Sequence, residues 1–269
     1  MTDRSAQFTG SIPAAYDRYL GPMLFEPYAE DLVARLAVPA KAAVLELACG
    51  TGILTQRLRR ALPVTVTLTA TDLNEPMLAY ARGKLPNAPI TWQPADAQEL
   101  PFPDGMFDAV ACQFGLMFVP DKAKAFAAVR RVLKRYGLFV FNVWQSLDEN
   151  SFGRIARDTI ARYFTSDPPT FYDVPFGFHD IPAIRSLLRA AHLNVVACEP
   201  VELEAKSPSA EDAARGLVMG NPVLLDVTER ATAPAEEIVA AVAQALAAEG
   251  GDQPLRLPMK ALVFLAQAF

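Results

Sequence analysis

The segment VLELACGTGILT, residues 44–55, constrains the fold more than any other stretch of this chain. An apolar run containing Glu46 leads to Gly50 and Gly52, after which apolar residues recur at helical spacing. Two glycines one residue apart allow a tight backbone turn and a close approach of whatever lies above it. A strand, a glycine turn and a helix in this order are typical of α/β proteins that hold a nucleotide-like ligand.

Strand and helix patterns alternate as far as residue 145. Asn74 with Pro76 marks one helix start, and Asp121 is placed to cap another. Such alternation predicts an α/β fold with a parallel sheet and right-handed crossovers. The predicted strands of this part are 43–48, 64–72, 90–96, 106–114 and 137–144.

Beyond residue 145 the alternation stops. An aromatic-rich stretch comes first, then a helix opening at Asp180, a strand, two helical patterns and a last strand. The last helical pattern is expected to end at Gly250. We therefore expect a single domain with helical cap insertions. Its parts are a core with N-terminal helices (1–145), an aromatic-rich insertion (146–179), the remaining core elements (180–204 and 258–269) and a helical insertion (205–257).

Composition narrows the partners and the compartment. The net charge is −5 and no basic run occurs, so neither nucleic acid nor an acidic membrane surface is an expected partner. The N-terminus lacks the apolar core of a signal peptide, and no stretch of about 18 apolar residues could span a bilayer. We expect a cytoplasmic protein. The cysteines fit neither a disulfide framework nor a metal site, and we expect Cys49 and Cys112 to be buried.

Acidic residues lie at the carboxyl ends of three successive predicted strands: Glu46, Asp72 and Asp96. Ligands of open parallel sheets bind just outside those ends. An acid ending the second strand is placed to accept hydrogen bonds from both hydroxyls of a ribose. Charge-assisted bonds of this kind are worth about 1.5–3 kcal/mol each.

A nicotinamide-dependent oxidoreductase is the main alternative. Its G-x-G-x-x-G fingerprint lacks the third glycine here, because Gly52 is followed by Ile-Leu-Thr. Tyr80 and Lys84 have the spacing of a short-chain dehydrogenase pair. They fall in the helix after the second strand, where helical surface spacing explains them better.

Five blocks of sequence then occur in a fixed order. They are ELACGTG (46–52), ATD (70–72) with Met77 and Leu78, ADAQELPF (95–102) followed by Phe107 and Asp108, RVLK (131–134), and IRSLLRAAHLNVV (184–196). This series resembles the class I S-adenosylmethionine (SAM) dependent methyltransferases, in particular the group that includes quinone-biosynthesis enzymes. The resemblance covers residues 16–145 and 180–200 and neither insertion.

Three departures from the family pattern stand out. Ala48 takes the place of the first glycine, which we expect to cost little. Arg135-Tyr136 replaces Pro-Gly, so the loop before the fifth strand is expected to differ in shape. His192 replaces a helix-ending glycine, and we interpret it as a left-handed cap residue.

The resemblance implies a Rossmann-like, seven-stranded, mostly parallel sheet with an antiparallel last strand and helices on both faces. It implies SAM as cofactor, S-adenosylhomocysteine as product and a set of binding residues. For the methionine part, the resemblance implies that Glu46 orients the amino group, that the backbone at Ala48, Gly50 and Gly52 passes under it, and that the Gln113 carbonyl accepts from the ammonium. For the adenosine part, it implies that Asp72 accepts from the ribose hydroxyls, that Leu73 and Met77 contact adenine, and that Asp96 and the Ala97 amide bond to the polar edge of the ring. Tyr16 and Tyr19 either close over the cofactor or serve packing alone.

Methyl transfer from a sulfonium needs alignment above all, which can supply about 7–11 kcal/mol of the barrier. A base is needed only where the acceptor carries a proton. His179 is the best candidate for such a base, with a structural role as its alternative.

The acceptor is less constrained than the cofactor. The fourth strand ends in QFGL (113–116), without the D/N-P-P-Y segment of enzymes that methylate nucleic-acid bases. An aromatic roof over the site would suit a small apolar or aromatic molecule. The same aromatic residues could instead fill a core of their own, or the insertions could form a homodimer interface. A non-catalytic SAM-binding module also stays open.

Overall fold

The computed structural model describes residues 6–269, and their contacts group them into two compact units. The sheet unit comprises Tyr28–Trp144, Phe178–Val201 and Ala261–Phe269. The helical unit comprises residues 6–27, Gln145–Gly177 and Glu202–Lys260. The boundaries predicted for the core and its insertions stay a prediction.

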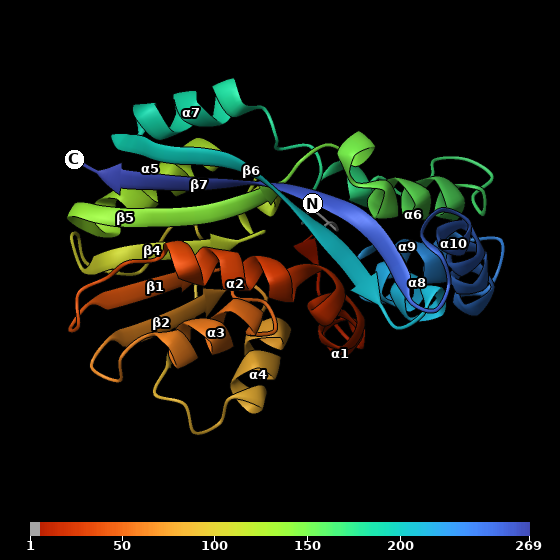
Figure 1. Cartoon of the computed structure of the whole chain (residues 1–269), viewed down its shortest axis with the longest axis horizontal. Coiled ribbons are helices and arrows are strands. Elements are labelled where there is room, and N and C mark those ends of the chain that lie inside the picture. Colours follow the sequence, from red (N-terminus) through yellow and green to blue (C-terminus); the bar gives the residue numbers. More distant parts are fainter. Residues whose placement is uncertain (1–5) are drawn as a thin grey trace. The chain divides into compact units, whose positions relative to one another are not determined.

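Within residues 6–269, seven strands form one sheet in the order β3-β2-β1-β4-β5-β7-β6, and Figure 1 shows β2, β1, β4 and β5 following one another across it. Strands β1 to β5 pair in parallel, and β7 is antiparallel to β5. This confirms the expected Rossmann-like sheet with its antiparallel last strand. The strands are β1 Ala43–Leu47, β2 Thr67–Asp72, β3 Thr91–Pro94, β4 Phe107–Gln113, β5 Leu133–Trp144, β6 Leu193–Ser207 and β7 Leu255–Ala268.

The strand order reverses between β1 and β4, which are direct neighbours although β2 and β3 separate them along the chain. Right-handed crossovers then place α3 and α4 on one face of the sheet and α5 on the other. The carboxyl ends of β1 and β4 therefore flank the point where α/β proteins of this type bind ligands. The helices of this part are α2 Glu26–Arg35, α3 Ile53–Ala61, α4 Glu75–Lys84, η3 Leu116–Phe118, α5 Lys122–Val132 and α7 Ile181–Ala190.

Predicted helix starts agree closely with the structure. The Asp121 carboxylate accepts a hydrogen bond from Lys124 N at 2.9 Å at the start of α5, and Asp180 caps α7 through Ala183 N at 3.2 Å. At the end of α7, His192 has φ of 57°, which confirms it as a left-handed residue.

Several element boundaries were predicted wrongly. Strand β2 begins only at Thr67, because residues 63–66 form a turn that leaves Val64 80% exposed. The segment 133–136 is no loop but part of β5, with Tyr136 in the left-handed region. Strands β6 and β7 each extend three residues into the predicted helical insertion, to Ser207 and from Leu255, and the helix α9 Val223–Arg230 was missed.

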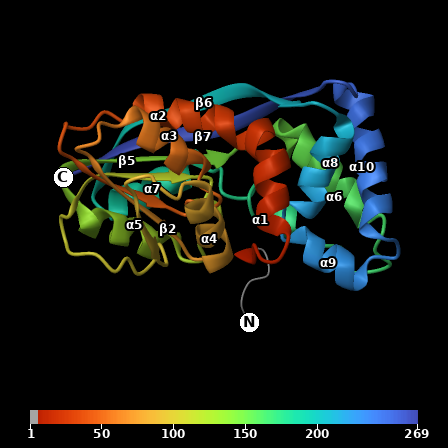
Figure 2. The same cartoon turned by 90° about the horizontal axis from the view of Figure 1, so that it is seen from below.

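The helical unit has its own core. Figure 2 shows α6, α8 and α10 side by side, in agreement with their mutual contacts. The buried ring of Phe152 lies 5.9 Å from that of Phe176, and the Tyr172 hydroxyl donates to Leu217 O at 2.7 Å. These aromatic residues fill the core of this unit, which supports the alternative to an aromatic roof. Its helices are α1 Ile12–Ala15, the π-helix η2 Tyr16–Phe25, η4 Leu147–Glu149, α6 Ser151–Ala161, η5 Phe171–Asp173, α8 Ala210–Met219, α9 and α10 Ala235–Gly250.

The N-cap of α5 offers a test of this part of the fold. Replacing Asp121 with alanine leaves the Lys124 amide without its acceptor and should lower the free energy of unfolding by about 1 kcal/mol. Asp104→Ala is the matched control, since this exposed residue makes a surface ion pair with Arg131 and its replacement should cost little. Chemical denaturation of both variants gives the comparison, and equal losses would contradict the assigned cap.

Candidate cofactor site

The turn after β1 is built from left-handed residues. Ala48, Gly50 and Gly52 have φ values of 51°, 55° and 79°, so the predicted tight turn is present. A Cβ on Gly52 would lie 3.0 Å from the Cβ of Ala81 in α4. The absence of a side chain at Gly52 thus lets the start of α3 lie close against α4. Ala48 also adopts the left-handed conformation, which is about 1–2 kcal/mol less favourable for a residue that has a Cβ.

Asp72 joins the end of β2 to this turn. Its Oδ2 accepts a hydrogen bond from Gly50 N at 2.8 Å, and its Oδ1 accepts one from Asn74 N at 2.8 Å. The side chain is buried, and burial raises the pKa of this carboxyl although the amide donors oppose the shift. Each oxygen keeps further lone pairs, so Asp72 can also accept from ligand hydroxyls.

Glu46 lies inside the sheet, in β1, one step before the turn. It is only 1% exposed, and its Oε2 has no hydrogen-bond partner among residues 6–269. Burial raises the pKa of this carboxyl to about 8, with the nearby Asp72 adding to the shift and Thr55 opposing it. The Thr51 hydroxyl in the turn is likewise buried without a partner in the described chain. A cation brought to this place would favour the ionised form of Glu46.

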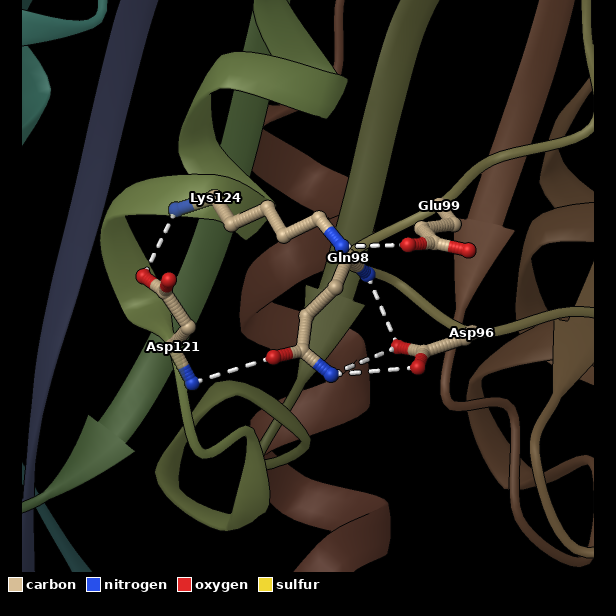
Figure 3. A network of polar contacts seen from close by, with 5 residues as sticks. All are labelled: Asp96, Gln98, Glu99, Asp121 and Lys124. Atoms are coloured by element: carbon tan, nitrogen blue, oxygen red, sulfur yellow. Dashed lines mark hydrogen bonds and ion pairs between the residues drawn. The ribbon is translucent and has the colours of Figure 1, made fainter.

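The loop after β3 is held by a polar network, drawn in Figure 3. The Asp96 carboxylate accepts from Gln98 N at 2.8 Å and from Gln98 Nε2 at 3.1 Å, and Gln98 Oε1 accepts from Asp121 N at 3.1 Å. Lys124 pairs with Glu99 beside it. The network ties the loop that carries Asp96 to the start of α5, so the carboxylate has a fixed place.

The end of β4 packs directly on the glycine turn. A Cβ on Gly115 would come within 2.4 Å of the Ala48 Cβ, so only glycine permits this approach. Phe114, just before it, is left-handed, with φ of 52°, and its ring stacks on Trp144 at 4.0 Å. Sequence reasoning missed Gly115, although a glycine directly after a predicted strand end is a recognisable signal.

The other predicted residues belong partly to the sheet unit and partly to the helical unit. Met77 is buried, and its Cε lies 4.0 Å from where a Gly50 Cβ would be, whereas Leu73 is 64% exposed. His179 is half-buried in the sheet unit. Tyr16 and Tyr19 belong to the helical unit. In that unit the Tyr16 ring stacks on Phe25 at 4.7 Å, and a Cβ on Gly216 would approach Tyr19 to 2.9 Å.

Comparisons with known proteins match this geometry. The sequence model of a family described as "Methyltransferase domain" matches residues 45–141. The ubiquinone/menaquinone biosynthesis C-methyltransferase UbiE of Psychromonas ingrahamii is 45% identical over 98 residues. Residues 45–141 are thus similar to a methyltransferase domain. The glycine turn, Asp72 and the unpartnered oxygen of buried Glu46 fit SAM as a cofactor.

The match to whole relatives is partial. The aligned part makes up 35% of this chain and 39% of the Psychromonas enzyme. For UbiE of a Marinomonas species the identity is 36%, over 49% of this chain and 55% of the relative. A Bacillus halodurans protein assigned as a methyltransferase has the same fold, with a TM-score of 0.59 at 18% identity, over 89% of this chain and 97% of its own. The chain thus spans about two fifths to just over half of these curated relatives' length.

The buried carboxyl of Glu46 predicts a pH dependence of stability. The folded pKa of about 8 lies above the ordinary value of 4.5. The contribution of Glu46 to the free energy of unfolding of the wild type is therefore fully present below about pH 4.5 and decreases as the pH rises to about 8, by at most about 1.4 kcal/mol per pH unit. Glu46→Gln lacks this titration, so the free energy of unfolding of the variant should rise relative to that of the wild type between pH 4.5 and about 8.

Urea unfolding of wild type and Glu46→Gln at pH 5, 6, 7 and 8 measures the difference. Asp72 and the other titrating groups occur in both proteins, so the difference reports the titration of Glu46 together with its coupling to Asp72. Parallel stability curves for the two proteins would show that Glu46 titrates normally in the folded state.

Proposed function

We propose that this protein transfers a methyl group from SAM to a small molecule. The hydrogen bond from Gly50 N to Asp72 Oδ2 carries the proposal, because it holds beside the glycine turn, at the reversal of the strand order, a carboxyl that would accept from ribose hydroxyls. The family match over residues 45–141 supports the same conclusion.

The turn would form the floor of the cofactor site. Gly50 and Gly52, which have no Cβ, would let the methionine part of SAM pass close to the backbone. Glu46 would orient the amino group and become ionised beside it. The Gln113 carbonyl at the end of β4 would accept from the same ammonium.

The adenosine part would lie along the ends of β2 and β3. Asp72 would accept from the ribose hydroxyls, with Leu73 and Met77 against the adenine ring. Asp96 would accept from the adenine amino group and the Ala97 amide would donate to a ring nitrogen. The exposed apolar side chain of Leu73 supports this arrangement, since a bound ring would cover it.

When bound, SAM supplies an electrophilic methyl group on a sulfonium. The task of this chain is then to hold that group in line with the acceptor atom and to exclude water. No nucleophilic side chain is required. Burial raises the pKa of the Cys112 thiol to about 12 and that of Cys49 well above its usual value, so both stay neutral thiols. A base would be required for an acceptor that carries a proton, and His179 is the candidate.

The acceptor proposed is a small apolar or aromatic molecule. The UbiE relatives are C-methyltransferases of ubiquinone and menaquinone biosynthesis by name, which supports an aromatic acceptor and a carbon as the methylated atom. The net charge of −5 argues against a nucleic-acid acceptor. Among residues 6–269, no helix has the length and apolar character needed to cross a membrane. We also propose a cytoplasmic location and keep a homodimer as one assembly state.

Ligand binding tests the proposed function. S-adenosylhomocysteine at about 100 times its dissociation constant should add about 2.7 kcal/mol of stability and raise the melting temperature by several degrees. Asp72→Ala should abolish this shift, since the main acceptor for the ribose is gone. Thermal melting of both proteins with each ligand gives the result, and Asp104→Ala, a surface variant outside the site, should keep the shift.

Melting curves with NAD and NADP distinguish the proposed methyltransferase from a nicotinamide-dependent oxidoreductase. Neither should change the melting temperature of the wild type, because the third glycine of their fingerprint is absent. A shift with NAD and none with S-adenosylhomocysteine would refute the methyltransferase proposal. Binding of S-adenosylhomocysteine without methyl transfer to any of a panel of phenols and quinols would favour a non-catalytic module.

A further inference from the structure

Asn142 is a buried amide in a strand that is otherwise apolar around it. It lies in β5 between Phe141 and Val143, and its exposure is 0%. Its Oδ1 accepts a hydrogen bond from Phe114 N at 3.0 Å, whereas its Nδ2 has no partner among residues 6–269. Leaving a buried donor unpaired is unfavourable, and an apolar residue would avoid that cost. The bond to Phe114 is therefore the contact that accounts for an amide here.

The residue held by Asn142 has a strained backbone. Phe114 is left-handed with φ of 52°, a conformation that persists in a bulky residue only where its surroundings over-determine it. Besides Asn142 Oδ1, the Asn142 carbonyl accepts from the same N–H at 3.3 Å. The Phe114 ring is stacked on Trp144 and meets the edge of Tyr28 at 5.3 Å. The backbone at the end of β4 is thus fixed from two sides.

The consequence concerns the carbonyl of the residue before Phe114. Phe114 N–H and Gln113 C=O belong to one planar peptide group, and in a trans peptide they point in opposite directions. An acceptor that fixes the N–H on one side also fixes the direction of the carbonyl on the other. Gln113 and Asn142 are register partners in the β4–β5 pair, so the side chain acts on the peptide directly beside it.

This peptide group lies at the cofactor edge of the sheet. Gly115, two residues after Gln113, approaches the Ala48 side chain in the turn so closely that no Cβ fits between them. Asn142 itself falls just outside residues 45–141, the part matched by the methyltransferase family. We propose that Asn142 is a positioning residue, whose bond to Phe114 N holds the Gln113 carbonyl in the direction required to accept from the α-ammonium of SAM.

The inference rests on the proposed function and deepens it, and two ligands test it. S-adenosylhomocysteine carries the α-ammonium, whereas 5′-methylthioadenosine has the same nucleoside and thioether without the amino-acid part. Asn142→Leu keeps a buried side chain of similar size and removes the side-chain acceptor at 3.0 Å, leaving Phe114 N–H only the longer contact of 3.3 Å to the main-chain carbonyl of residue 142. Calorimetric titration should show S-adenosylhomocysteine binding about 10- to 100-fold more weakly to this variant, the range for losing a hydrogen bond to a charged group. The affinity for 5′-methylthioadenosine should stay within about two-fold of the wild-type value, because this ligand has no ammonium to bond to the Gln113 carbonyl.

Two further variants separate positioning from packing. Val140→Ala removes a fully buried side chain from the same strand, two residues away, and should leave the ratio of the two affinities unchanged. Asn142→Asp keeps an oxygen that can accept from Phe114 N–H and should restore most of the preference for S-adenosylhomocysteine. Asn142→Ala replaces the leucine variant if the latter does not fold.

The outcomes are distinct. An equal loss for both ligands in Asn142→Leu, or an unchanged affinity for S-adenosylhomocysteine, would overturn the positioning role while leaving the proposed function intact. A wild type that binds neither ligand would refute the proposed function itself, and the role of Asn142 with it. A selective loss in Asn142→Leu, rescued by Asn142→Asp, would establish the role.

Discussion

The hydrogen bond of 2.8 Å from Gly50 N to Asp72 Oδ2 is the contact on which the site depends. It joins the turn after β1 to the end of β2, which is the neighbouring strand. Left-handed φ values at Gly50 and Gly52 aim the turn at this carboxylate, and the missing side chain at Gly52 brings α4 against it. On the other side of β1, Gly115 lets the end of β4 approach Ala48. The carboxyl ends of β1, β2 and β4 are thus held together by the bond from Gly50 N to Asp72 and by a close approach that a side chain at Gly115 would prevent.

Burial sets the electrostatics of the same edge. The pKa values of Glu46 and Asp72 are both raised because burial excludes water from their carboxyls. The Glu46 carboxyl has an unpaired oxygen, and the proposed ligand would bring its ammonium to this carboxyl. A bound cation stabilises a buried carboxyl site more than it stabilises an exposed one, because little solvent screens the interaction between the two charges. The polar network of Figure 3 and the amide of Asn142 play a different part, since they fix loop positions through hydrogen bonds.

Much of the sheet unit follows from local sequence. Asp121 and Asp180 cap helices as expected, and the left-handed His192 ends α7, because these effects act over three or four residues. The failures occur where distant pairing overrides local preference. Residues 133–136 join β5 because β4 pairs with Leu133, and β6 and β7 extend beyond the predicted strands because they lie side by side in the sheet. The aromatic residues of 152–176 pack within the helical unit, which no periodicity in the sequence could reveal.

The sequence by itself determined the glycine turn and the acids at the strand ends, because glycine takes a left-handed turn at little cost and a carboxylate can accept from a ribose. The order of its sequence blocks indicated the class of ligand. Only the tertiary structure decided that Asp72 bonds to Gly50, that Glu46 is enclosed with an oxygen unpaired, and that Asn142 bonds to Phe114. These depend on which strands become neighbours and on how much water their packing excludes. Both are properties of residues far apart in the chain.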